Sequence, residues 1–348
     1  MKRWIAFLLC VAMTLSLAAC AKDTPVSPAT SQPAAPSGNS VEEPAGTDFP
    51  TAPITLVCPW KAGAGADTIC RMFESMGQEY FGVPIVVENQ DGAAGVTATV
   101  NYLNGAKNDG YTVLFNNGGV FTSKSLMDVV EYSIDDFQPI CGIVKDVNVL
   151  IVSSKLGVST FEEFIKKYSG TGESLLIGCA TAGIPHVCMA QLFQQANVTY
   201  TQVAYNGASE ITTALLGGHV DAICIGTSEI GAVKDTKDAV ILTAFADKTP
   251  QVAGLEDVPP VTKFGYNVDT CVWRMLLVQK GTPDEVLDIL YNGFTKMIQD
   301  PRFESFATEN GLMIDIKTPE QVTAAVHEEL DAMIPVFEEL KLGRYADK

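Results

Sequence analysis

The chain of 348 residues has few basic side chains and lacks the short motifs of several enzyme classes. It carries 23 Lys and Arg against 41 Asp and Glu, and its net charge of −18 argues against nucleic acid as a partner. Its three histidines are not spaced as metal ligands. Neither a Gly-Lys-Ser/Thr phosphate loop nor a Gly-x-Ser-x-Gly nucleophile turn occurs. We therefore predict no cofactor, no metal and no catalytic residue.

The nine cysteines include no Cys-x-x-Cys pair. Cys10 and Cys20 belong to the N-terminal segment, which leaves seven, an odd number. Most of the seven lie in apolar runs, so we interpret them as small buried hydrophobic residues rather than as a disulfide framework. A single disulfide pair stays open.

The N-terminus has the plan of a secretory signal. Lys2 and Arg3 precede an apolar run that ends at Leu17, shorter than the roughly 20 residues of a membrane-spanning helix. Leu17-Ala18-Ala19-Cys20 resembles a bacterial lipobox, in which Cys20 is lipidated; the alternative is an ordinary signal peptide with a coincidental Cys. We predict a signal at 1–20, a disordered tether at 21–50 rich in Pro, Ser, Ala and Thr, and an extracytoplasmic protein held at the membrane by lipid.

From residue 54 onward, strand and helix patterns alternate. Strand patterns at 54–59, 85–88 and 111–115 are separated by helical patterns, and a second series of the same kind follows between about 151 and 271. The fold class predicted is therefore α/β, with parallel sheets covered by helices on both faces. Thr282 and Thr318, each followed by Pro, are predicted helix N-caps.

The turn at 60–67 joins a strand directly to a helix through small residues. Such a turn exposes the free N–H groups of the first helical turn, which favour an anion, and we interpret it as a grip for a carboxylate. The alternative is a plain turn with Asp67 as the N-cap. Trp60, beside this turn, either packs against the ligand or covers the core. The turn at 181–186 repeats the pattern.

Several stretches carry a resemblance to a known family. The chain resembles the extracytoplasmic solute receptors of tripartite tricarboxylate transporters from residue 54 to its end. The similarity is carried by C-P-W-K-A-G-A-G-A-D-T-I-C-R (58–71), V-V-E-N-Q-D-G-A-A-G (86–95), D-G-Y-T (109–112), A-Y-N-G-A (204–208), L-L-G-G-H-V-D-A (215–222) and G-T-P-D-E-V (281–286).

The resemblance implies two periplasmic-binding-protein-like domains that close on a small organic carboxylate, one of 51–150 with 272–348 and one of 151–271. It implies a monomer that binds without catalysis and delivers its solute to membrane transporter subunits. The implied ligand-binding residues lie in the two small-residue turns and at the cleft: Trp60, Ala62, Gly63, Ala64, Gly65, Asp67, Asn117, Thr181, Ala182, Gly183, His186, Tyr205 and Thr227.

The chain departs from the family pattern in ways that bear on the solute. Ala182 and Ile184 make the second turn less polar than the usual serine-rich one, which disfavours a tricarboxylate. Arg274 is a candidate partner for a second acid group. Two rival functions stay open: a secreted enzyme with Asp67 or His186 as base, and a surface protein that binds a macromolecule.

Overall fold

The computed structural model describes residues 48–127, 130–180, 183–205, 207–268 and 270–346. Contacts between Cα atoms divide the chain into residues 1–45 and residues 46–348, and every described residue belongs to the second unit. The predicted lipidation residue Cys20 lies outside the described residues, as does the tether up to residue 47. Among the described residues, no helix is long and apolar enough to cross a membrane.

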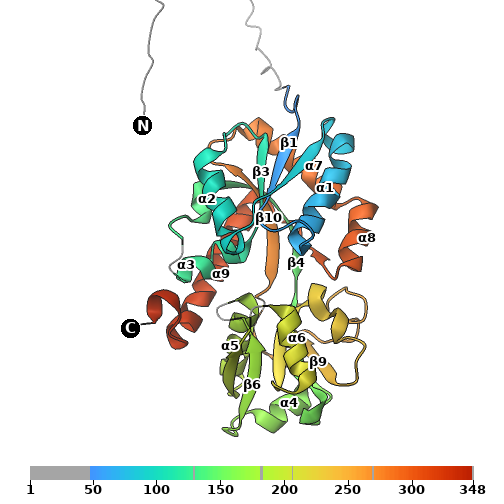
Figure 1. Cartoon of the computed structure of the whole chain (residues 1–348), viewed down its shortest axis with the longest axis vertical. Helices are drawn as coiled ribbons and strands as arrows, with labels where there is room; N and C mark the ends of the chain where they lie inside the picture. Colours follow the sequence, from blue (N-terminus) through green and yellow to red (C-terminus); the bar gives the residue numbers. More distant parts are fainter. Residues whose placement is uncertain (1–47, 128–129, 181–182, 206, 269, 347–348) are drawn as a thin grey trace, which may run out of the picture. The chain divides into compact units, whose positions relative to one another are not determined.

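The described strands form two sheets (Figure 1). The first sheet has the order β11-β4-β10-β3-β1-β2, and the second has the order β7-β6-β8-β5-β9. The strands of the first sheet are β1 (Ile54–Cys58), β2 (Ile85–Asn89), β3 (Thr112–Asn117), β4 (Phe137–Asp146), β10 (Val272–Gln279) and β11 (Met313–Ile314). Those of the second are β5 (Asn148–Ser153), β6 (Ser174–Cys179), β7 (Thr199–Ala204), β8 (Ala222–Gly226) and β9 (Ala239–Ala244).

Helices cover both faces of each sheet, which confirms the predicted α/β fold class. The α-helices are α1 (Gly65–Phe81), α2 (Val96–Gly105), α3 (Ser123–Leu126), α4 (Phe161–Tyr168), α5 (Ile184–Gln195), α6 (Ala208–Gly217), α7 (Asp284–Ile298), α8 (Pro301–Glu309) and α9 (Pro319–Glu339). The short 3₁₀ helices are η1 (Ala93–Gly95), η2 (Gly118–Val120), η3 (Ile134–Asp136), η4 (Ser154–Leu156), η5 (Thr227–Ala232), η6 (Val261–Phe264) and η7 (Gly343–Tyr345).

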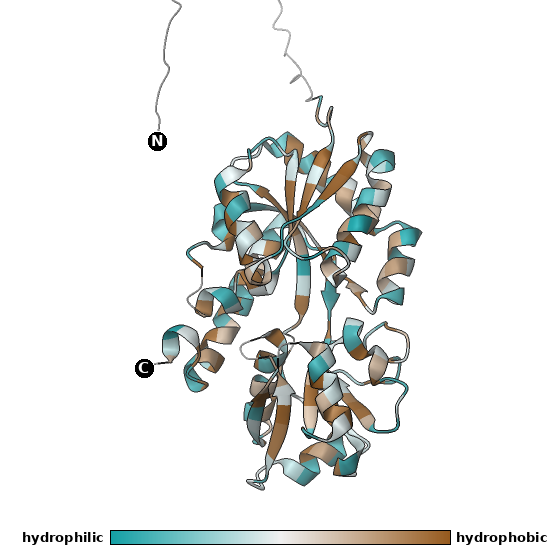
Figure 2. Cartoon of the chain, in the orientation of Figure 1, coloured by the Kyte–Doolittle hydropathy of each residue, from teal (hydrophilic) through white to brown (hydrophobic). Residues whose placement is uncertain are grey.

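The apolar stripe of α1 shows how the helices attach to the sheets. Ile69, Phe73 and Met76 recur at helical spacing and are fully or almost fully buried against β1 and β3. The Phe73 ring stacks on Phe303 of α8 at 5.2 Å and meets Phe294 of α7 edge-on at 5.3 Å. Each such side chain contributes about 1.5–3 kcal/mol by burial. Figure 2 shows the same pattern as hydrophobic strands between helices whose outer faces are hydrophilic.

The predicted parallel sheets are in fact mixed. In the first sheet, β10 runs antiparallel to both neighbours β3 and β4, while β1, β2 and β3 are parallel. In the second sheet, β5 runs antiparallel to β8 and β9, while β6, β7 and β8 are parallel. Strands β5 and β10 are each the first strand after the chain passes from one sheet to the other. A strand that enters from the carboxyl end of a sheet, without a returning helix, must run against its neighbours.

Local boundaries also differ from the prediction in places. Thr282 is not the N-cap of α7; Pro283 holds that position, and the Thr282 hydroxyl donates to the Gln279 carbonyl at 2.7 Å. Helix α8 begins at Pro301, and the Asp300 side chain caps it. Strand β9 and helix α8 were not predicted. The Thr318 cap of α9 is confirmed, with Gln321 completing a capping box.

All seven cysteines of the described residues are buried as thiols. Burial raises the pKa of the Cys179 thiol to about 12 and raises those of Cys141 and Cys224 as well. The interpretation of these residues as small hydrophobic core members is confirmed.

We expect the thiols of a folded chain that begins at residue 46 to react with Ellman's reagent far more slowly than a free thiol, because all seven are buried. After unfolding without reductant, all seven should react. Val86→Cys, at a position that is 47% exposed, gives the rate of an accessible thiol in the same fold. Fast reaction of several native thiols, or fewer than seven after unfolding, would contradict the assignment.

Candidate functional site

A cavity of about 610 Å³ lies where strands of both sheets end. The first sheet contributes the turn after β1 and the last residue of β3, Asn117. The second contributes η5, which follows β8, and strand β10 contributes Val272 and Arg274. Residues 308–312, from the end of α8 onward, complete the wall. The cavity therefore lies at the carboxyl ends of the strands, where open α/β sheets bind ligands.

The turn between β1 and α1 forms because its residues permit an abrupt change of direction. Gly63 has a φ of +82°, which favours glycine, and α1 then begins at Gly65 with Ala64 at the N-cap. The N-cap side chain makes no hydrogen bond. Among the described residues, the N–H groups of Gly65, Ala66 and Asp67 have no hydrogen-bond acceptor. The positive end of a 17-residue helix thus faces the cavity with unused donors.

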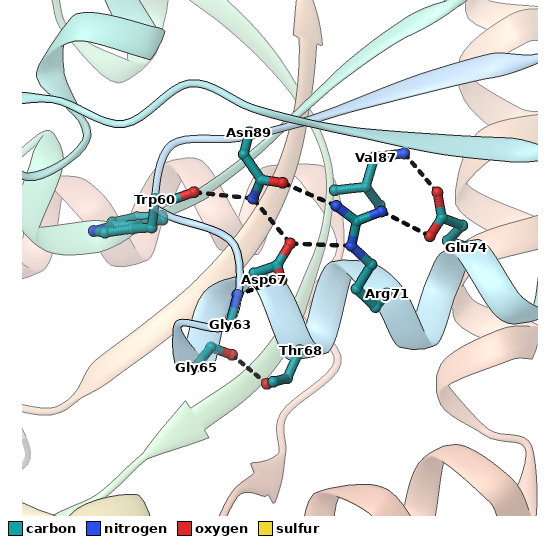
Figure 3. A network of polar contacts seen from close by, with 9 residues as sticks. All are labelled: Trp60, Gly63, Gly65, Asp67, Thr68, Arg71, Glu74, Val87 and Asn89. Carbon is teal, nitrogen blue, oxygen red and sulfur yellow. Dashed lines mark hydrogen bonds and ion pairs between the residues drawn. The ribbon is translucent and has the colours of Figure 1, made fainter.

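The Asp67 carboxylate holds this turn in place (Figure 3). It accepts hydrogen bonds from the Gly63 N–H at 2.7 Å, the Asn89 amide at 2.8 Å and Arg71 Nε at 3.2 Å. The same Asn89 amide donates to the Trp60 carbonyl at 2.9 Å, which ties both ends of the turn to β2. Asp67 is 5% exposed and does not line the cavity. It is not the N-cap either, since Ala64 holds that position.

The charge of Asp67 is stabilised by its donors. Burial raises the pKa of this carboxyl, but the Gly63 N–H, the Asn89 amide and the Arg71 guanidinium together lower the pKa by more. Asp67 is therefore ionised at neutral pH, and Arg71 compensates its charge. An anion at the start of α1 is therefore repelled less than it would be by a carboxylate without an ion-pair partner.

Arg274 and Asn117 stand opposite each other on neighbouring strands β10 and β3, and both line the cavity. The Asn117 side-chain oxygen accepts from the Val120 N–H at 3.2 Å, which leaves its amide group as a donor. The Arg274 side chain is 13% exposed. Its Nη2 lies 3.8 Å from Asp146 Oδ2, and its buried Nη1 has no hydrogen-bond partner among the described residues.

An acidic corner closes the cavity on the side of the second sheet. Asp146, at the end of β4, accepts from the Ser228 N–H at 3.0 Å, the Ser228 hydroxyl at 2.5 Å and the Thr227 hydroxyl at 3.1 Å. The Thr227 hydroxyl also lies 2.6 Å from the Gly311 carbonyl, so these two acceptors share its one hydrogen. Glu229 borders the same cavity. The pKa of its carboxyl is raised, first because burial removes water from the carboxyl and second because the Asp146 carboxylate disfavours another negative charge nearby.

Six of the predicted site residues line this cavity: Trp60, Gly63, Ala64, Gly65, Asn117 and Thr227. Ala62 is exposed outside it, and Gly183 is the N-cap of α5. His186 lines a separate cavity of about 330 Å³ with Tyr200, and Tyr205 borders a hollow beside α6. Thr181 and Ala182 lie outside the described residues. The ligand-binding role of all these residues stays a prediction.

His186 is 2% exposed, and burial lowers its pKa to about 4, so the imidazole is neutral at physiological pH. It faces the side of α5 that packs near the end of α9, not the 610 Å³ cavity. Among the described residues, no group of three or more His, Cys, Asp or Glu side chains is placed to hold a metal ion.

Sequence reasoning missed the acidic corner. Asp146 and Ser228 are 82 residues apart, and their contact depends on how the two sheets meet. The one local signal was a carboxylate, Asp146, at the end of the apolar strand β4 and just before the apolar strand β5. Nothing in residues 308–312 points to a cavity wall.

The chain has two helix-covered sheets joined by direct crossings, and a polar cavity lies at the carboxyl ends of their strands. This is the architecture of the periplasmic binding proteins. Residues 69–342 match the model of the tripartite tricarboxylate transporter family receptor, TctC, and the chain belongs to this family of extracytoplasmic solute-binding receptors. The match begins just after the β1–α1 turn.

Relatives and solved structures agree with this assignment. A UPF0065 protein of Agrobacterium vitis is 28% identical over 302 residues, which cover 84% of this chain and 85% of the relative. A TctC solute binding protein from Polaromonas has the same fold, with a TM-score of 0.75 at 23% identity over 84% of this chain and 99% of that one. Two R. palustris structures also share the fold at 21% identity. For Rpa4515 with adipate, the TM-score is 0.69, and the match covers 85% of this chain and 99% of that one. For MatC with bound malate, the TM-score is 0.65, and the match covers 83% of this chain and 99% of that one.

We expect Asp67→Asn to destabilise the fold by about 1–3 kcal/mol at pH 7, because the turn loses a charged acceptor that is 5% exposed. The folded-state pKa of Asp67 is lowered, so its stabilisation is present above the unfolded pKa of about 4 and is lost as pH falls through the folded value. The difference in the free energy of unfolding between wild type and variant should therefore be smaller in acid. Urea unfolding at pH 7 and pH 3 measures it.

The control is Asp91→Asn, because Asp91 makes only an exposed 3.8 Å pair with Lys61 that contributes little. A gap for Asp67→Asn that does not change with pH would contradict the proposed role of its charge.

Proposed function

We propose that this chain captures a small organic carboxylate outside the cytoplasm and delivers it, unchanged, to a tripartite tricarboxylate-type membrane transporter. The observation that carries the proposal is the unused first turn of α1 at the wall of a cavity of about 610 Å³. Backbone N–H groups at a helix start bind carboxylates without needing a basic protein surface. This suits a chain whose net charge is −18.

The cavity favours a carboxylate for further reasons. Gly65 leaves its surroundings open, since an added Cβ there would meet no atom within 4 Å, and a ligand oxygen can approach the backbone. Asn117 offers a side-chain amide from β3. The structural neighbours with adipate and with malate hold dicarboxylates in the same fold, which supports this class of ligand.

We further propose two domains that close on the solute, 51–150 with 272–348 and 151–271. The chain passes directly from β4 to β5 at Val147, and β10 starts at Val272, so bending at two short segments would move one sheet relative to the other. An added Cβ at Gly119 would lie 3.6 Å from Ile184, so the start of α5 already lies beside the end of β3. Closure would bring the start of α5 toward the ligand.

The receptor is proposed to be a monomer anchored through lipid on Cys20 and a tether at 21–50. The support is the lipobox-like sequence at 17–20 and the composition that follows it. The rival enzyme is disfavoured because its two candidate bases are engaged elsewhere. Asp67 is bound within the turn, and His186 borders another cavity.

Gly65→Asp should abolish carboxylate binding, because it places a negative charge beside the N–H groups that hold the anion. We expect a loss of at least about 100-fold in affinity for adipate and malate by isothermal titration calorimetry, since a like charge in such a contact costs several kcal/mol. Asp is also well tolerated at a helix start, so the fold should survive.

Gly65→Asn is the matched control, because it has the same size without the charge, and Gly65→Ala adds only a methyl group in open space. Both should keep most of the affinity. Unchanged binding by Gly65→Asp would rule out α1 as the anion site.

A further inference from the structure

The Arg274 guanidinium is the one buried cation at the wall of the cavity whose donors, within the described residues, are not all used. Its side chain is 13% exposed, and Nη1 is buried without a hydrogen-bond partner there. A buried N–H group of a charged side chain that lacks an acceptor is costly, and native proteins seldom keep one without a reason. The position of the group at a cavity wall points to an acceptor supplied by a ligand.

Asp146 does not satisfy this guanidinium. Its nearest oxygen lies 3.8 Å from Arg274 Nη2, which is too long for a hydrogen bond. The Asp146 carboxylate instead accepts from the backbone and hydroxyl of Ser228 at 3.0 and 2.5 Å. The Asp146 carboxylate can lie close to the backbone at Gly226 because this residue has no Cβ, which would lie 2.7 Å from both carboxylate oxygens. Asp146 is thus committed to the corner of the second sheet and only partly offsets the charge of Arg274.

The cavity therefore has two distinct groups of donors for anions. The first turn of α1 supplies backbone N–H groups, and β10 supplies a guanidinium, whose planar fork matches a carboxylate. Asn117, which pairs with Arg274 across β3 and β10, borders the same space. A single carboxylate at α1 would leave the accessible part of the Arg274 side chain without an acceptor, whereas the second acid group of a ligand with two would supply one.

The remaining charges limit how many acid groups the cavity accepts. Asp146, Glu229 and Glu309 border it, against the cations Arg274 and Lys234. A third ligand carboxylate would face these acids without a donor of its own. The charge distribution favours a dianion over a trianion.

We propose that Arg274 selects dicarboxylates by binding the second carboxylate of a solute whose first carboxylate is held at the start of α1. This inference rests on the proposed carboxylate function. It specifies that the solute carries two acid groups and that Arg274 binds the second one. Arg274 is then the specificity-determining residue of the cavity.

The test compares dicarboxylates with monocarboxylates of equal chain length: succinate with butanoate, glutarate with pentanoate, and adipate with hexanoate. Calorimetry on the full chain should show that wild type binds one dicarboxylate at least about tenfold tighter than its monocarboxylate partner. Arg274→Gln should weaken dicarboxylate binding far more than monocarboxylate binding and so remove that preference, and thermal unfolding shows whether the variant is folded. Arg274→Lys keeps the charge without the fork and should retain only part of the preference.

Lys234→Gln is the matched control, because it removes a positive charge from an exposed side chain of the same cavity. It should keep the preference for the dicarboxylate. The inference is overturned if Arg274→Gln keeps the preference, if it weakens both members of a pair equally, or if Lys234→Gln removes the preference as completely. Wild type that binds both members equally overturns the inference alone. Wild type that binds none of the six acids overturns the carboxylate function with it.

Discussion

The site depends on the carboxylate of Asp67 holding the turn between β1 and α1. By accepting from Gly63, Asn89 and Arg71, it fixes a turn that leaves the first N–H groups of α1 without acceptors of their own. The helix donors that face the cavity are available because a side chain behind them, not at the N-cap, supplies the structural bonds. An acidic protein can hold an anion at such a place because the attraction is local.

The second constraint is topological. The chain enters each sheet once from its carboxyl end, as β5 and as β10, and each of these two strands runs antiparallel to both of its neighbours. The carboxyl ends of β1, β3, β4 and β8 then contribute to one cavity, together with the first residues of β10. Arg274 occupies the wall because it lies at the start of a reversed strand, beside Asn117 at the end of β3. Strand direction and binding chemistry are thus linked.

The order of strands and helices and the turn at α1 could be predicted from local sequence, whereas strand direction and the acidic corner could not. Alternating strand and helix patterns, the glycine-containing turn after β1 and the turn at Asp109, whose carboxylate accepts from the Tyr111 N–H at 3.0 Å, are local. Strand direction depends on where the chain crosses between sheets, which periodicity does not record. The acidic corner joins residues 82 positions apart. His186 has the right sequence context but faces the α9 side of α5, because helix packing sets its direction.

We propose that the cavity binds an organic acid and leaves it unchanged. Isothermal titration calorimetry against mono-, di- and tricarboxylates, aromatic acids and amino acids tests it most directly, with mass spectrometry of the solute recovered after incubation. The account predicts saturable binding of one class of carboxylate at one site per chain, with the solute recovered intact. A chain that binds none of these acids, or that converts the acid it binds, would contradict it.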